Sequence, residues 1–303
     1  MQPKPALSVC IITYRRPAPL GRLLASLANQ TGMLPAFEVL IVDNDVEESA
    51  LPVCKKFELL LPLRYVVEPM PGIAPARNRS VEASRAPYIA YLDDDQVVGP
   101  EWLTMLFNAA VGSGADGVFA PVVGKVEGEL PEWLREVGFF DYAPIPSGSP
   151  IPRSRTRTGN CCLRRSALPS RAPFDVGLAL VGGEDVELFG RMIRQGARLI
   201  AISEPVIHEI HPAARANAVW LIRRSFRNGG TFANCEWGGL GRLSQWRRAV
   251  RALFQSAMYS LYALRQLRRS RGAAFALFLR SCSALGRAAW VVGIVYAEYR
   301  RNR

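Results

Sequence analysis

Tyr91-Leu92-Asp93-Asp94-Asp95-Gln96 is the stretch that decides the fold of this 303-residue chain. It closes an apolar run, residues 87–92, that has the length and composition of a buried strand. Three adjacent carboxylates repel one another and need a compensating charge. A divalent cation with oxygen ligands supplies that charge and also binds phosphates. An acidic, solvated loop that starts a helix is the alternative for such a triplet taken alone.

Strands and helices alternate on both sides of the triplet. Apolar runs predict strands at residues 7–13, 37–42, 63–67 and 118–123, and amphipathic stretches predict helices that begin near residues 17, 74 and 102. This alternation is typical of an α/β fold with a doubly wound, mostly parallel sheet, which we expect over about the first 125 residues. Ligands bind at the carboxyl ends of strands in such sheets. Thr13, Asp43 and Asp93–Asp95 fall at such ends, which favours a ligand site.

The second half of the chain gives weaker signals. Residues 143–159 are rich in Pro, Ser, Arg and Gly, and we interpret them as a mobile loop that serves as a lid. A helix is predicted from Glu184 to about Gln195. Another is predicted over 217–227, ended by Asn228-Gly229-Gly230.

Charge divides the chain sharply. Residues 1–241 hold 25 Lys and Arg against 25 Asp and Glu, whereas residues 242–303 hold 13 Arg and one acid, Glu298. An acidic partner for the tail alone is therefore expected, either anionic lipid or nucleic acid. The six cysteines show no C-x-x-C pair and no disulfide pattern, which predicts reduced thiols, a cytosolic compartment and no zinc site. The first residues do not resemble a signal peptide.

The tail is predicted to form two long helices, 243–271 and 273–301. Their longest uncharged runs are thirteen residues (252–264) and ten residues (288–297). About 18–20 apolar residues are needed to span a bilayer, so we expect the helices to lie in the membrane interface. The alternative is a helical pair packed on the catalytic domain with a solvated Arg face.

A set of motifs now identifies a family. The stretches Val9–Pro17, Val42-Asp43-Asn44-Asp45, Ala76-Arg77-Asn78, Leu92–Asp95 and Gly183-Glu184-Asp185, followed by His208, together resemble family 2 glycosyltransferases. Thr158–Cys161 and Trp220–Gly229 further resemble bacterial exopolysaccharide glucosyltransferases of succinoglycan type. The resemblance covers about residues 7–232 and implies a GT-A nucleotide-diphospho-sugar transferase fold. It implies a catalytic domain over 1–241, with a nucleotide-binding half to about residue 125 and an acceptor half from 126, followed by a membrane-associating region over 242–303.

The resemblance also implies roles for single residues in donor binding. Asp43 would accept a hydrogen bond from the uracil imide, and a cap of the following turn is its alternative. The nucleotide-sugar would further contact residues that flank these strands: Thr13, Arg15, Asp45, Arg77, Asp93, Asp94 and Asn160. Asp95 would bind Mg²⁺ or Mn²⁺ directly, and Asp93 would contact the ribose or a metal-bound water. His208 would be a further metal or phosphate ligand, with His211 as the other candidate.

The catalytic pair implied is Asp185, as the general base, with Glu184 beside it. Inverting transfer needs one carboxylate at the acceptor hydroxyl. The alternative is that both carboxylates only stabilise a helix N-terminus. Gln245-Trp246-Arg247-Arg248 does not match the Q-x-x-R-W block of processive synthases, so one sugar should be added per encounter.

The activity implied is transfer of a single hexose, glucose in the first place, from a UDP-sugar. The acceptor would be a polyprenyl-diphosphate-linked saccharide at the cytoplasmic face of the bacterial inner membrane. A nucleotidyltransferase is one rival, but it predicts a Gly-rich, Lys-bearing loop after the first strand, where this chain has Tyr14-Arg15-Arg16-Pro17. A non-enzymatic nucleic-acid binder is the other rival. Because the tail aromatics lie in apolar runs, they suit lipid better, and no nucleic-acid partner is expected.

Overall fold

The computed structural model of the protein describes residues 4–140, 143–179 and 182–294. These residues form two compact units. The first unit lies within residues 1–124, 142–180 and 184–210, and the second within 125–141, 181–183 and 211–303. The second unit therefore begins well before residue 242 and takes in more of the chain than the basic tail.

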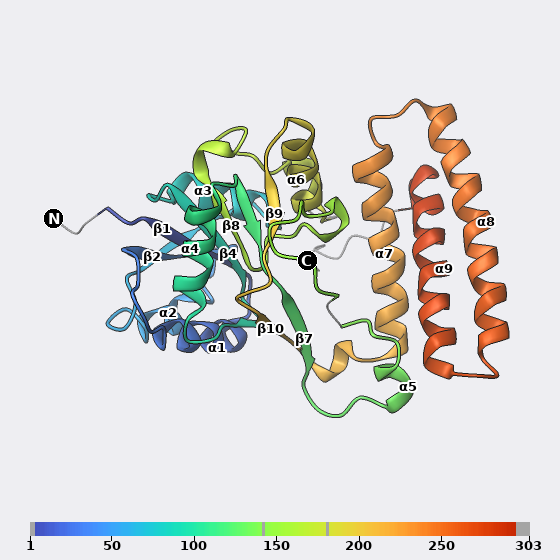
Figure 1. Ribbon diagram of the computed structural model, residues 1–303, viewed down its shortest axis with the longest axis horizontal. Helices are drawn as coiled ribbons and strands as arrows, with labels where there is room; N and C mark the ends of the chain where they lie inside the picture. The colour runs from blue at the N-terminus through green and yellow to red at the C-terminus, as the bar shows by residue number, and fades with distance from the viewer. Residues whose placement is uncertain (1–3, 141–142, 180–181, 295–303) are drawn as a thin grey trace. The chain divides into compact units, whose positions relative to one another are not determined.

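A seven-stranded sheet forms the centre of the first unit (Figure 1). Its strands, in spatial order, are β3 (Leu63–Val67), β2 (Phe37–Asp43), β1 (Leu7–Thr13), β4 (Tyr88–Asp93), β8 (Cys161–Arg164), β6 (Gly117–Phe119) and β9 (Leu199–Ala201). Neighbours from β3 to β4 are parallel, as are β6 and β9, whereas β8 runs antiparallel to both of its neighbours. The prediction of a mostly parallel sheet is confirmed.

Helices cover both faces of this sheet, and alternation along the strands builds a core on each face. Their bounds are α1 (Pro17–Ala28), α2 (Leu51–Lys55), α3 (Ile73–Ala83), α4 (Trp102–Ser113) and α6 (Glu184–Arg194). In β1, Val9 and Ile11 pack into the core that contains α1 and α4, while Cys10 packs into the core that contains α3 and α6. Both faces of the strand are buried, which explains why its sequence is continuously apolar.

A second, three-stranded sheet has the order β5 (Gln96–Val97), β10 (Ile207–His211) and β7 (Val122–Val126). The prediction of a mobile loop over 143–159 is wrong for its middle. Gly148 N donates to Ala201 O at 2.8 Å, and Ile151 N donates to Leu199 O at 3.0 Å, so this stretch pairs with β9. A short 3₁₀ helix, Arg153–Arg155, follows. Backbone pairing, which composition does not reveal, holds this segment in place.

The second unit is helical and contains α5 (Glu132–Arg135), α7 (Ala218–Trp237), α8 (Arg242–Gln266) and α9 (Arg271–Val291). Helices α7, α9 and α8 lie side by side, with α9 in the middle (Figure 1). Within the described ranges, no helix is both long enough and apolar enough to cross a membrane. The end of the second predicted tail helix, residues 295–301, lies outside the described residues.

The predicted end of α7 at Asn228-Gly229-Gly230 is wrong, because the helix continues to Trp237. Gly229 and Gly286 are where α7 and α9 touch. A Cβ atom added at Gly229 would lie 1.9 Å from the carbonyl oxygen of Ser283, and one at Gly286 would lie 1.9 Å from that of Phe226. These glycines therefore allow the two backbones to approach closely, and they do not stop the helix.

Candidate active site

The carboxyl ends of β1, β2 and β4 meet at one edge of the sheet. In the register of the strands, Thr13 lies opposite Asp43, and Ile12 lies opposite Asp93. The sequence placed these polar residues at strand ends, and the strand order brings them together. Such an edge is where α/β sheets bind their ligands.

Arg16 forms ion pairs with two of the three carboxylates in the triplet. Its guanidinium lies 2.5 Å from Asp94 and 2.9 Å from Asp95, both nearly buried. The hydroxyl of Thr13 donates to the other oxygen of Asp94 at 2.8 Å. The sequence places Arg16 only in a turn and did not predict this role. The available signal was a basic turn after β1, the strand that lies beside β4.

Arg77 links the triplet to α6. Its buried guanidinium donates to Glu184, lies 3.7 Å from Asp93, and is placed over the ring of Phe174. Gly159 leaves room for this arrangement, because a Cβ atom there would lie 2.9 Å from a carboxylate oxygen of Asp93. Residues from β4, α3 and the start of α6 therefore share one charged network.

Two carboxylates at this edge, those of Asp93 and Asp94, have pKa values raised to about 7. The side chain of Asp93 keeps 44% of its surface exposed. Desolvation by the protein around its carboxylate nevertheless raises the pKa of Asp93 to about 7. Arg77 opposes this rise in pKa, whereas the carboxylates of Asp95, Glu209 and Asp185 add to it. Asp185 is thus within electrostatic range of Asp93, as the predicted catalytic site requires. Glu209, from β10, is a neighbour that sequence reasoning missed.

The donor chemistry of this edge suits a hard divalent cation. Asp93 and Asp95 offer carboxylate oxygens, and the raised pKa of Asp93 reflects its burial first and then the neighbouring carboxylates of Asp95, Glu209 and Asp185. In the part of the chain that the structure describes, no group of three or more His, Cys, Asp or Glu side chains is arranged to hold a metal. Mg²⁺ is commonly held by one or two carboxylates together with substrate phosphates. The residues fit such a shared site, which the phosphates of a substrate would complete.

Asp43 and Asp45 lie at the start of the loop after β2. Both oxygens of the fully buried Asp43 accept hydrogen bonds from the protein, from the backbone N–H of Asp45 and Ala50 and from the hydroxyl of Tyr65. Asp45 pairs with Arg15, which is 58% exposed. Asp43 thus makes the contacts of a cap for the following turn, which is the alternative interpretation of this residue. Its contact with uracil stays a prediction.

Asn160 is fully buried and belongs to the scaffold. Its amide oxygen accepts from the indole of Trp102 at 2.8 Å, and its amide nitrogen donates to the carbonyls of Pro121 and Pro205 at 2.7 and 2.9 Å. The residue adopts φ of +57°, in the left-handed region that asparagine tolerates better than most residues. These contacts leave Asn160 no exposed surface for the predicted contact with a donor sugar.

The two histidines lie in different surroundings. His208 of β10 lies opposite Val97 of β5. Val97 follows Asp95 by two residues. His211 belongs to the helical unit, where its ring packs against Phe140 with centroids 4.7 Å apart. Of the two candidates, His208 is therefore the one in the same unit as the triplet.

Comparison with known proteins identifies the family. Residues 8–171 match Glycosyl transferase family 2, and the chain belongs to this family. It is 35% identical to the succinoglycan biosynthesis protein ExoM of Rhizobium meliloti (strain 1021), across 74% of this chain and 73% of ExoM. It is also 29% identical to validoxylamine A glucosyltransferase of Streptomyces hygroscopicus subsp. jinggangensis, across 63% of this chain and 52% of that enzyme.

Solved structures share the fold at low sequence identity. The mannosyltransferase PcManGT of Pyrobaculum calidifontis, in complex with GDP-Man and Mn²⁺, has a TM-score of 0.63 at 18% identity, covering 95% of this chain and 88% of that one. S. aureus TarS 1-349 in complex with UDP-GlcNAc has a TM-score of 0.54 at 15% identity, covering 95% and 92%. The GT-A fold expected from the sequence is thereby confirmed.

Proposed function

We propose that the protein transfers a single hexose, glucose in the first place, from a UDP-sugar to a lipid-linked oligosaccharide, with inversion. The product would serve exopolysaccharide or cell-envelope glycan synthesis. The name of ExoM, a succinoglycan biosynthesis protein, supports this setting, and validoxylamine A glucosyltransferase supports glucose. A UDP-sugar is supported by TarS, whose structure holds UDP, whereas the structure of PcManGT holds GDP-Man.

Asp185 acts as the base in this proposal. Its carboxylate takes the proton of the acceptor hydroxyl while that oxygen forms a bond to the anomeric carbon. The bond from the anomeric carbon to the diphosphate breaks on the opposite face, and the nucleoside diphosphate leaves with the bonding electrons. Asp185 is half-buried in the first turn of α6.

Other residues position the reacting groups. Glu184 is fixed by Arg77, and this contact sets the start of α6 and hence the place of Asp185. Asp93 and Asp95 would hold Mg²⁺ or Mn²⁺, which supplies charge neutralisation for the leaving diphosphate when bound. Arg15, 58% exposed beside Asp45, is available to the nucleotide.

The observation that carries the proposal is the convergence of Asp93, Arg77, Glu184 and Asp185 on one charged network. The test compares Asp185→Asn with Glu187→Gln, a carboxylate in the same helical turn that pairs with Arg191. We expect transfer to fall by about 10² or more in the first variant only, with UDP binding unchanged in both. Near-normal transfer by Asp185→Asn would refute the assignment. A panel of UDP- and GDP-sugars with Mn²⁺ identifies the donor.

The tail is proposed to hold the enzyme at the cytoplasmic face of the inner membrane. Helix α8 supports this with an exposed apolar stripe whose members recur at helical spacing: Leu243, Trp246, Val250, Leu253, Leu261 and Leu264. Arg247, Arg251 and Arg265 flank the stripe on one side, as in helices that lie in the membrane interface. Because α8 packs against α9 in a shared unit, point variants test this better than deletion of the tail.

Leu253→Glu places a carboxylate on the stripe without removing a buried contact, since Leu253 is half-exposed. We expect weaker sedimentation with phosphatidylglycerol vesicles and unchanged UDP binding. Glu in place of Met33, exposed in the first unit, is the control. Equal binding of both variants to vesicles would refute the membrane assignment while leaving the transferase assignment intact.

A further inference from the structure

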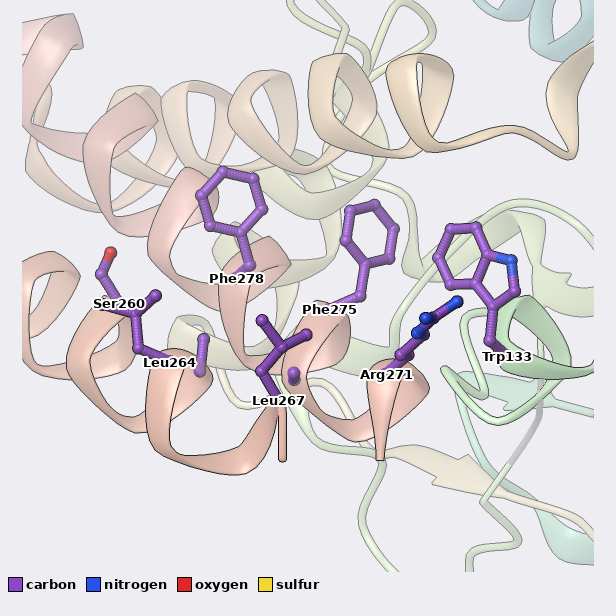
Figure 2. A pocket seen from close by; sticks show the side chains of 9 residues that line it. Trp133, Ser260, Leu264, Leu267, Arg271, Phe275 and Phe278 are labelled. Atoms are coloured by element: carbon purple, nitrogen blue, oxygen red, sulfur yellow. The ribbon is translucent and has the colours of Figure 1, made fainter. Parts of the chain in front are cut away.

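The helical unit contains an apolar groove of 610 Å³. Its walls come from α5, α8 and α9, and its lining residues are Trp133, Ser260, Ala263, Leu264, Leu267, Arg271, Ala274, Phe275 and Phe278. Figure 2 shows Trp133, Phe275 and Phe278 along one side, the leucines along the other, and Arg271 near the end marked by Trp133. The volume lies in the range of about 300–1,000 Å³ that is usual for ligand sites.

Close packing of α5 against α9 beside the groove holds its walls in place. A Cβ atom at Gly272 would lie 2.5 Å from the carbonyl oxygen of Trp133, so α5 is in backbone contact with the first turn of α9. The ring of Trp133 also meets that of Phe275 edge-on, with centroids 5.4 Å apart. Ala263 and Ala274 are too small to fill the space beside these rings. The groove is therefore built into the packing of the unit.

The lining decides the class of ligand. Among the described residues that line it, Arg271 carries the one charge and Ser260 the one hydroxyl, which already bonds with Ser281 at 2.9 Å. An extended peptide would bury backbone N–H and C=O groups that this lining leaves unsatisfied, at a cost in free energy. A hydrocarbon chain brings no such groups, and an anion at its end would be matched by Arg271.

The rim of the groove indicates where such a chain comes from. Leu264, Leu267 and Phe278 are 66%, 55% and 39% exposed, so the groove opens into an apolar surface that continues the stripe of α8. The turn that joins α8 to α9 adds Arg268 and Arg269, both exposed. Apolar side chains flanked by arginines are complementary to the interface of a bilayer that contains anionic lipid.

We propose that this groove takes up one acyl chain of an anionic phospholipid from the bilayer, with the lipid phosphate at Arg271. The proposal rests on the membrane association proposed above and adds a specific lipid site to it. It does not depend on the identity of the donor or on the reaction. A lipid held in this way would fix how the helical unit is oriented on the membrane, which the stripe of α8 alone does not.

Tryptophan fluorescence tests the proposal in the full-length chain. Trp246 is first replaced by Phe, because it lies on the exposed stripe and would report any insertion. Vesicles of phosphatidylglycerol with brominated acyl chains should then quench the remaining emission, and Trp133→Phe should remove most of that quenching. Quenching that persists unchanged without Trp133 would overturn the proposal.

Two matched pairs of variants keep the test independent of that substitution. Ala263→Phe fills the groove, whereas Ala257→Phe adds the same ring to an exposed position of α8. Only Ala263→Phe should abolish the quenching of Trp133, with UDP binding and helical circular dichroism retained in both. Arg271→Gln should weaken binding to anionic vesicles about fivefold. Arg248 is an exposed arginine of α8 that does not line the groove, and Arg248→Gln should weaken this binding less.

Equal effects within either pair would overturn the proposal. Protection of Trp133 from this quenching by a short-chain prenyl phosphate, but not by a short-chain phosphatidylglycerol, would also overturn the proposal. It would assign the groove to a different lipid. Loss of UDP binding or of transfer in an otherwise lipid-binding protein would bear on the proposed function and not on this site.

Discussion

Breaking the buried ion pair between Arg77 and Glu184 should cost far more stability than its position on a helix suggests. The two side chains are only 5% and 3% exposed. Arg77→Met keeps the length of the side chain and removes its charge, which leaves the carboxylate of Glu184 buried without this partner. Loss of one member of a buried pair typically lowers the free energy of unfolding by about 3–5 kcal/mol.

The same helix offers a matched control. Arg79 pairs with Glu82 at 2.7 Å, with side chains 38% and 62% exposed. Exposed pairs of this kind contribute about 0.2–1 kcal/mol. Arg79→Met should therefore leave stability almost unchanged, although it removes the same functional group two residues away. The contrast isolates burial as the cause of the difference.

A double-mutant cycle measures the coupling between the two residues. Arg77→Met, Glu184→Gln and the double variant are unfolded in urea, and the loss of about 3 kcal/mol in a single variant should shift the midpoint by about 1 M. Because the double variant has no unpaired charge in this pair, it should recover much of that loss. Effects that add within about 0.5 kcal/mol would refute the argument, since independent residues behave that way.

Further predictions concern the helical unit and the metal site. Gly229→Ala should destabilise the protein by several kcal/mol because its methyl group overlaps the carbonyl of Ser283, whereas Gly239→Ala, with no neighbour within 4 Å, should not; thermal melts compare the two. Since folding raises the pKa of Asp93 from 3.8 to about 7, the folded state binds the extra proton, and the ligand-free protein should lose stability between about pH 4 and 7. For the same reason, the thermal shift from Mn²⁺ with UDP should be larger at pH 8 than at pH 6, and equal shifts would contradict the assignment. UDP with EDTA should give a smaller shift than UDP with Mn²⁺.

The strands could be predicted because strands buried on both faces have continuously apolar sequences. Each of β1, β2 and β4 is apolar on both faces, and only a doubly covered sheet buries both. The end of α7 could not be predicted, because a glycine that stops a helix and one that allows a close helix crossing have the same appearance in sequence. Gly229 is of the second kind, and only the contact with α9 reveals this.

The site residues divide in the same way. Asp93 and Asp185 could be proposed as site residues because their motifs are local and belong to a recognisable family. The pairing of Arg16 with Asp94 depends on β1 lying next to β4, and that is a property of the strand order. Asn160 shows the opposite case. A polar residue at a strand end looks like a ligand contact in sequence, yet its amide group is hydrogen-bonded to two backbone carbonyls and an indole.

Charge balance connects the network to donor binding. Two guanidinium groups, Arg16 and Arg77, face the carboxylates of the triplet together with Glu184, so negative charge is left over before Asp185 is counted. That excess works with burial to raise the pKa of Asp93. A nucleotide diphosphate is itself an anion and would be repelled by such a site. Paired with a divalent cation it would be attracted, because the cation offsets charge on both sides. Donor and metal should therefore bind with positive coupling, each raising the affinity of the site for the other by the same factor.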